Sequence, residues 1–238
     1  MNNCRNCKEP VEWDYCPKCG QPTKLKRIDW QYIVQEIGEF FYANKGMIYT
    51  IRKVLISPGD SVREFLTEGR HRFIKPITFL FLTTLIYMLV AHLFNIGVED
   101  ISPVKIDMGE MLSPFAIWIM ENPRYSITLI AIFVAFWLKI IFKKYGYNFF
   151  EIFILMCFVT GTVTLIDTLG AIFQGITNIN PTQISLYIGI IYNTWAIGQF
   201  FDRKKAASYV KAFLSYIIGA FTLGIIIAIV VIIETAIK

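Results

Sequence analysis

The chain has 238 residues and a formal net charge of +5, with 55% hydrophobic and only 17% charged residues. Soluble domains carry about 25% charged residues, and a single soluble core of this size could not bury so much apolar surface. The composition therefore excludes an ordinary soluble globular protein and favours a membrane protein.

Four cysteines fall within the first twenty residues and form two Cys-x2-Cys pairs; they are Cys4, Cys7, Cys16 and Cys19. Thiolate pairs at this spacing can close a tetrahedral Zn²⁺ site, and such short ribbons draw most of their folding free energy from the metal. Residues 1–30 are polar and contain no apolar signal-peptide core. We therefore expect a zinc ribbon with a basic linker over residues 1–27, in a reducing cytoplasm where metal binding is favoured over disulfide formation.

The ribbon could dock a protein, contact nucleic acid, hold iron as rubredoxin does, or serve only as a metal-stapled knob. Its few basic residues are nearly balanced by acidic ones such as Glu9 and Asp14, so no basic stripe forms and nucleic acid is disfavoured as a partner. Gly20 permits the tight turn that directs backbone N–H groups toward a thiolate. We expect Trp13 and Tyr15 to pack over the metal site.

Residues 28–73 show apolar side chains at helical spacing, which predicts amphipathic helices at a membrane interface. Gly46 suits the left-handed position at which a helix ends, so a new short helix is expected directly after it. Pro58 fits the first turn of a third helix, and we expect Ser57 and Asp60 to form a capping box at the start of that helix. We expect the apolar side chains of this region, Phe65, Leu66 and Phe73, to dip into the acyl boundary.

Five longer apolar segments follow, each near the roughly 20 residues that an α-helix needs to cross a bilayer. Lipid cannot satisfy open backbone groups, so helices are the expected structure. The predicted fold is an all-α membrane protein, with a bundle of about five transmembrane helices over residues 74–238. The predicted spans are residues 74–95, 125–142, 149–173, 184–201 and 209–233.

The distribution of lysine and arginine orients these spans. Of the 23 basic residues, thirteen lie at or before the start of the first span, and the loops over 143–148 and 202–208 are basic as well. The loops over 96–124 and 174–183 are predominantly acidic or uncharged. This alternation follows the positive-inside rule. We expect a multi-pass membrane protein, with its N-terminus in the cytoplasm and its C-terminus outside.

A basic cluster lies where the chain enters the membrane; its members are Arg63, Arg70, Arg72 and Lys75. Such clusters commonly anchor proteins to anionic headgroups, each charge contributing about 1 kcal/mol. Because arginine binds phosphate through two parallel hydrogen bonds, a specific site for phosphate or a lipid headgroup is the alternative. Membrane lipid is an expected partner in either case.

Polar residues also occur inside the predicted spans. Thr160, Thr164 and Asp167 share one face of a helix, and Asn193 in the next span is a candidate partner. A carboxyl group in hydrocarbon is costly unless it is paired, protonated or hydrated. The set predicts either a polar site within the bundle, for a proton or a substrate, or hydrogen bonds that pack helices together.

Ala220, Gly224 and Ala228 recur every four residues in the last predicted span. Membrane helices approach one another closely along small-residue faces with this spacing. We expect this face to pack within the bundle, with the seam of a homo-oligomer as the alternative.

Short motifs follow one another in order from the ribbon to the first span: Cys16-Pro17, Cys19-Gly20-Gln21, Lys45-Gly46, Thr50, Pro58-Gly59, Arg63-Glu64-Phe65-Leu66, Gly69-Arg70, Phe73 and Pro76. In this order they resemble an uncharacterised family of bacterial multi-pass membrane proteins whose N-terminal zinc ribbon ends in Cys-Gly-Gln. The resemblance covers about the first 80 residues. It implies no activity, and it suggests residues 45–76 as the common element of the family.

The sequence contains no complete catalytic constellation. We expect a binding or scaffolding protein, in which the cytoplasmic ribbon docks a protein partner and the bundle anchors it. One alternative is a transporter or lipid-handling protein that uses the polar residues around Asp167. A second alternative is a membrane enzyme that acts on lipid phosphate at the basic cluster, although that cluster is accompanied by no evident nucleophile.

Overall fold

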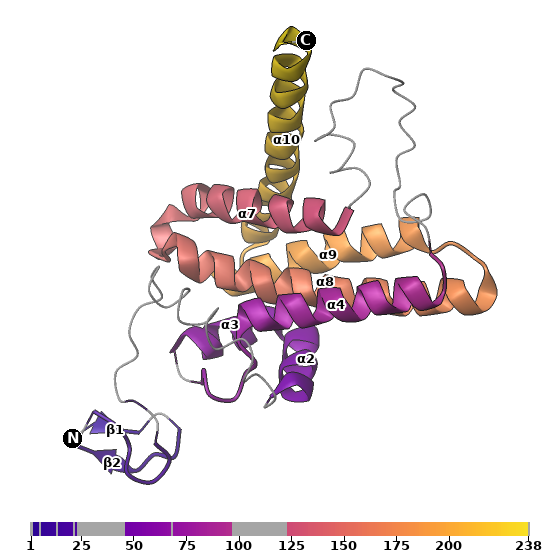
Figure 1. Cartoon of the computed structure of the whole chain (residues 1–238). Helices are drawn as coiled ribbons and strands as arrows, with labels where there is room; N and C mark the ends of the chain where they lie inside the picture. Colours follow the sequence, from indigo (N-terminus) through magenta and orange to yellow (C-terminus); the bar gives the residue numbers. More distant parts are fainter. Residues whose placement is uncertain are drawn as a thin grey trace.

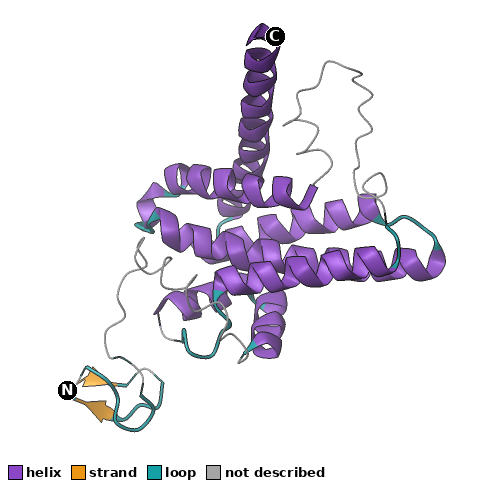
Figure 2. Cartoon of the chain, viewed as in Figure 1, coloured by secondary structure: helices purple, strands orange, loops and turns teal. Residues whose placement is uncertain are grey.

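The computed structural model describes residues 2–4, 6–12, 14–20, 22, 46–67, 69–96 and 123–237. Apart from two short strands, the regular structure in these residues is helical (Figures 1 and 2). The elements in chain order are β1 (Asn2–Asn3), β2 (Pro10–Val11), α2 (Met47–Ile56), α3 (Pro58–Thr67), α4 (Pro76–Leu93), α7 (Pro123–Ile141), the 3-10 helix η3 (Lys143–Tyr145), α8 (Phe149–Thr177), α9 (Thr182–Asp202) and α10 (Ala206–Ile237). The predicted helical class is confirmed.

Helix α8 is the centre of the helical body. It contacts α4, α7 and α9, and its buried residues extend from Ile152 to Ala171. Its first turn is fixed by a capping box, in which Asn148 and Glu151 each accept a hydrogen bond from the other's backbone N–H. Helix α10 contacts α7 and α9, crosses them, and extends its second half away from the body (Figure 1).

Five long helices occupy the five predicted spans, with ends displaced by at most four residues. Three stretches are long and apolar enough to cross a membrane: α4, α8 and residues Ala206–Glu234 of α10. The apolar stretch of α7, Ser126–Ile141, is shorter, and α9 buries polar side chains such as Asn193 and Gln199. The described residues therefore contain three candidate spans, and the predicted number of five is not confirmed.

Helices α2 and α3 pack against one end of this body, and we call residues 46–75 the collar. Gly46 has a left-handed φ of 108°, as its position predicted, and α2 follows it directly. A Cβ atom at Gly46 would lie 2.5 Å from the carbonyl oxygen of Arg72, in the loop between α3 and α4. A side chain at Gly46 would therefore also push this loop away. The loop is held in turn by the backbone N–H of Ile74, which donates to Thr50 Oγ1 at 2.9 Å.

Helix α3 lies directly against the end of α9. The backbone N–H of Gly59 donates to Gln199 Oε1 at 2.8 Å, and Arg63 donates to the carbonyl oxygen of Phe200 at 3.0 Å. A Cβ atom on Gly59 would lie only 2.4 Å from the backbone nitrogen of Phe200. The Pro58-Gly59 motif therefore serves close packing between two helices that are distant in sequence.

The expectation that Phe65 and Phe73 dip into lipid is wrong. Both side chains are buried in the protein core, and their ring centroids lie 5.4 and 6.2 Å from that of Phe158 in α8. Leu66 is partly buried and packs against the same core. Periodicity in the sequence identifies an apolar face, but it cannot say whether lipid or protein covers that face.

The start of α3 also differs from the expected capping box. Asp60 pairs with Arg63 one turn later in the same helix. The hydroxyl of Ser61 donates to the carbonyl oxygens of Ser57 and Lys53, at 2.6 and 2.8 Å, and so joins the end of α2 to the start of α3. The carboxylate of Asp60 therefore pairs with the charged side chain of Arg63, whereas in a capping box it would accept from the backbone N–H of Ser57.

Helix α10 does not pack through the small-residue face that we expected. Gly224 is exposed, and among the described residues no heavy atom would lie within 4 Å of a Cβ atom placed there. The neighbouring face makes the contact instead, because Gly219 is buried against Val134 and a Cβ atom there would lie 2.6 Å from Val134 Cγ2. The spacing of small residues does not reveal which of two adjacent faces meets a partner.

Candidate metal centre and intramembrane cavities

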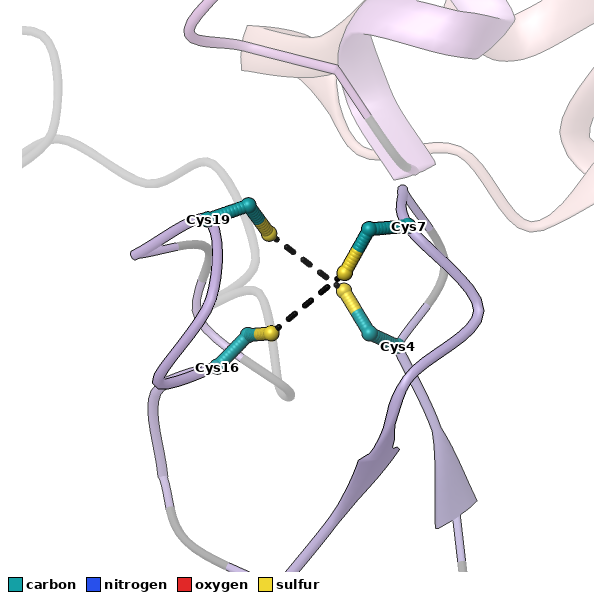
Figure 3. A group of neighbouring side chains, drawn as sticks. All are labelled: Cys4, Cys7, Cys16 and Cys19. Atoms are coloured by element: carbon teal, nitrogen blue, oxygen red, sulfur yellow. Dashed lines mark hydrogen bonds between the residues drawn. The ribbon is translucent and has the colours of Figure 1, made fainter.

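Two turns bring the four cysteine sulfurs of the ribbon together (Figure 3). Cys4 Sγ lies 3.6 Å from Cys19 Sγ, Cys7 Sγ lies 3.5 Å from Cys16 Sγ, and all four lie within 4.8 Å of one another. Tetrahedral bonds of about 2.3 Å between zinc and thiolate separate the sulfurs by about 3.8 Å. The cluster could therefore hold one metal ion, and four thiolates suit Zn²⁺ and iron alike.

The two turns have the same backbone geometry. The N–H of Lys8 donates to the carbonyl oxygen of Cys4 at 2.9 Å, and the N–H of Gly20 donates to that of Cys16 at 2.8 Å. Lys8 and Gly20 are both left-handed, with φ of 62° and 70°. The turn at Gly20 was predicted, whereas the one at Lys8 was missed because lysine carries no such signal. The only signal for it is positional, since each residue directly follows the second cysteine of its pair.

The thiols of Cys4 and Cys7 differ in acidity. The backbone N–H of Cys7 interacts with Cys4 and, against the opposing effect of desolvation, lowers the pKa of the Cys4 thiol to about 6. The backbone N–H of Glu9 lowers the pKa of Cys7, but desolvation and the nearby sulfur of Cys16 outweigh it and raise that pKa to about 12. Negative charges repel in so compact a cluster, and a bound divalent cation removes that repulsion.

The apolar core of the ribbon is small in the residues that the structure describes. Val11 is buried with Cys4 and Cys16, and Cys7 packs against them. Tyr15 is 65% exposed, so the expectation that it covers the metal site is wrong, and Trp13 lies outside the described residues. A unit with so few apolar contacts would gain much of its folding free energy from a bound metal.

Three basic segments of the described residues, the collar, the turn between α7 and α8 and the segment after α9, meet at one end of the helical body. Arg203, which follows α9, lies 3.8 Å from Asp60 in α3. Tyr145, in the basic turn between α7 and α8, donates to Asp202 at 3.4 Å. The segments that we expected on one side of the membrane are therefore neighbours in space.

The four predicted headgroup residues have different surroundings. Arg63 is engaged within the protein by Asp60 and the Phe200 carbonyl, whereas the others lie in the loop that leads to α4. In that loop Arg70 and Lys75 are partly buried, and Arg72 is exposed and donates to Asn6 of the ribbon. Headgroup binding by these residues stays a prediction.

Two cavities lie among α7, α8, α9 and α10, and Tyr87 of α4 also lines the larger one. A cavity of about 80 Å³ is lined by Thr160, Asp167 and Asn193, three of the four polar residues predicted to form an intramembrane site. A second cavity of about 250 Å³ adjoins it and also includes Asp167. The fourth residue, Thr164, donates to the carbonyl oxygen of Thr160 within its own helix.

The sequence did not point to two further polar residues that line both cavities, Ser185 in α9 and Tyr216 in α10. Asn193 was expected to meet Asp167, but its amide donates to the carbonyl oxygen of Gly189 in its own helix, at 2.9 Å. Both residues nevertheless line the smaller cavity. No local pattern brings Tyr216 to Asp167, because 49 residues separate them.

The fold and the cysteine cluster define a helical protein with three candidate membrane spans and a potential metal ribbon. Residues 44–88 match the model of a protein family described as "Protein of unknown function (DUF3667)". The match covers the collar and most of α4, and it includes the residues that fix the collar, Gly46, Thr50, Gly59 and Arg63. No curated protein and no solved structure matched the chain.

Proposed function

We propose that this protein is a membrane-anchored docking protein of the bacterial inner membrane. Zn²⁺ folds the N-terminal ribbon, and the folded ribbon recruits a cytoplasmic protein to the membrane. The observation that carries this proposal is the grouping of four sulfurs at the spacing of a single ion, in a unit with almost no other core. Closed four-cysteine sites of this kind are typical of structural zinc.

The arrangement of basic residues supports a cytoplasmic ribbon. The collar, the turn between α7 and α8, and the segment after α9 gather at one end of the body through contacts such as Arg203 with Asp60. Basic segments remain on the cytoplasmic side. A reporter fused ahead of residue 1 should therefore be active in the cytoplasm and inactive in the periplasm.

The docking role is tested by cross-linking in cells. A photo-activatable residue at Tyr15, which is exposed, should capture a protein partner when the ribbon is folded. Adding Cys16→Ser should abolish that adduct without reducing the amount of protein in the membrane. Cys157→Ser is the matched control, because Cys157 is buried in α8. The same adducts in the Cys16→Ser protein, or none in the parent, would refute docking by the ribbon.

The cavities around Asp167 favour a second candidate function, a transporter or lipid-handling protein. Carboxylates inside membrane segments commonly mark pathways for ions or substrates. Asp167→Asn at normal abundance should remove a cellular phenotype of the gene if this function is right. A membrane enzyme acting on lipid phosphate gains no such support, because Arg63 is engaged by Asp60 and Phe200.

A further inference from the structure

We propose that the two cavities around Asp167 form one binding site for a small organic cation, a protonated amine that carries a hydrocarbon body. This inference rests on the second proposed function, the handling of a small molecule within the membrane, and it is independent of docking by the ribbon.

The two cavities share a wall built from α7, α8, α9 and α10. The residues that line both are Ile127, Ile130, Asp167, Ser185, Leu186 and Tyr216. Their volumes are about 80 and 250 Å³. Together these reach the lower end of the range for small-molecule sites, about 300–1,000 Å³. The space suits a compact ligand, which would touch Asp167 from either side.

The charge and the aromatic rings of the wall select a cation. Among the described residues that line either cavity, Asp167 alone is charged. A carboxylate has about four acceptor positions, so the contacts that it makes within the protein leave capacity for an ammonium donor. Tyr87 and Tyr216 also line the larger cavity, and aromatic faces attract ammonium groups. A carboxylate beside aromatic rings is complementary to an amine and opposes an anion.

The rest of the wall suits a hydrocarbon body. Ile127, Ile130 and Leu186 line both cavities, and Met156 and Val163 line the smaller one. In an environment of low dielectric constant, attraction between a carboxylate and an ammonium group is stronger than in water. An amine with an apolar body therefore gains from the charge and from the surrounding side chains together.

The larger cavity lies toward the end of the bundle opposite the basic segments. It is lined by Gln174 near the end of α8 and by Pro181 and Thr182 at the start of α9. The collar contacts the other ends of these helices, through Phe158 of α8 and Gln199 of α9. The site is thus displaced from the collar and is nearer the side that we assign to the cell exterior.

Helix packing alone does not account for this arrangement. Asn193 lines the smaller cavity, but its amide donates to the carbonyl oxygen of Gly189 in its own helix. Polar groups that served only packing would close the space between helices, whereas here the space persists beside them. A cavity that contains a carboxylate fits a ligand better than a structural contact.

The test uses the full-length protein in nanodiscs of neutral phosphatidylcholine, with empty nanodiscs as the baseline. Three probes of similar size are compared by titration calorimetry: phenethylamine at neutral pH, the neutral 2-phenylethanol and the anionic 3-phenylpropionate. The amine should bind at least about tenfold more tightly than the alcohol, and the acid should not bind. Equal affinities for amine and alcohol in the parent protein would overturn the proposal without any variant.

Two variants locate the site. Asp167→Asn should weaken binding of the amine at least about tenfold and leave the alcohol unchanged. Ser185→Leu, which places a larger side chain in the space beside the shared wall, should weaken the binding of both the amine and the alcohol. Asp202→Asn, at the basic end of the body, is the control carboxylate and should change neither. Full amine affinity in folded Asp167→Asn and Ser185→Leu would place binding elsewhere and refute the site. Amine binding without any transport or phenotype would keep the site and reject the second proposed function.

Discussion

The ribbon and the collar are held in place by different physical forces. Among the described residues of the ribbon, Val11, Cys4 and Cys16 form the buried core, and the four cysteine sulfurs lie within 4.8 Å of one another. In the collar, Val54, Val62 and Phe65 are buried within the core cluster that also contains residues of α8 and α9. The first unit has four potential metal ligands and few buried side chains, and the second belongs to a large buried core.

This difference predicts that the two units fail independently. Loss of metal should unfold the ribbon and leave the helices intact, because no buried apolar contact of the ribbon belongs to the core cluster of the helical body in the described residues. Damage to the collar should loosen the helices and leave metal binding unchanged. Proteins whose stability comes from one continuous core would not separate in this way.

The largest expected effect is removal of one ligand. Cys16→Ser should reduce the zinc content of purified protein from one ion per chain to none, and hydrogen exchange over residues 4–20 should become fast. Exchange in α8 should stay slow. Zinc is measured by mass spectrometry, with Cys157→Ser as the control that retains metal. Fast hydrogen exchange throughout α8 in the Cys16→Ser protein would show that the ribbon and the helices fold as one unit.

The next effect is truncation of the collar core. Phe65 is 1% exposed and packs against Phe73 and Phe158, so Phe65→Ala should lower the free energy of unfolding by about 3–5 kcal/mol. Zinc content should not change. Ile48→Ala is the control, because Ile48 is 84% exposed and should change stability by about 0.5 kcal/mol or less. Loss of zinc in the Phe65→Ala protein would contradict independence of the two units.

A smaller effect distinguishes a closed glycine contact from an open one. Gly59→Ala places a Cβ atom 2.4 Å from the backbone of Phe200, and the resulting displacement should lower the free energy of unfolding by about 1–3 kcal/mol. Gly224→Ala should cost nothing in an isolated chain, since nothing described lies within 4 Å of that Cβ. Denaturant titration compares the two. A clear loss of oligomer in Gly224→Ala would instead identify its face as a seam between copies.

The helices could be predicted because their signals are local. Apolar length locates α4 and α8, Gly46 marks the start of α2, and Pro58 marks the first turn of α3. The four cysteines likewise carry their chemistry in their spacing. Each of these features depends on residues within a few positions of one another, so one sequence is enough to find it.

The remaining features depend on contacts between distant segments. The apolar face of the collar is covered by Phe158 of α8, although its periodicity equally suits a lipid surface. Tyr216 reaches the cavity of Asp167 because α10 crosses the bundle, which hydropathy does not show. Lys8 is left-handed, against the preference of lysine, in the turn that follows the cysteine pair Cys4 and Cys7.

A change of pH should affect zinc binding by the ribbon, because its thiols must be deprotonated to bind the metal. Because Cys4 has a pKa of about 6 and Cys7 a pKa of about 12, Cys4 is ionised at neutral pH and Cys7 must lose a proton to bind metal. Zinc affinity should therefore rise about tenfold per pH unit for this proton, and its dependence should steepen below pH 6, where Cys4 is protonated too. Competition with a chelator between pH 5.5 and 8 measures this. An affinity independent of pH would contradict the assignment of Cys7 as a ligand.

The smallest effects concern exposed ion pairs, and we compare one pair from each unit. Lys18 lies 2.9 Å from Glu9 in the ribbon, and Lys53 lies 3.3 Å from Glu64 in the collar, where hydrogen bonding to the carboxylate raises the pKa of each lysine. Lys53→Ala should lower stability by about 1 kcal/mol or less, and salt should reduce the difference. Lys18→Ala should leave zinc affinity unchanged within error. Since neither pair is buried, a large effect of Lys18→Ala would mean that charge, in addition to metal, holds the ribbon together.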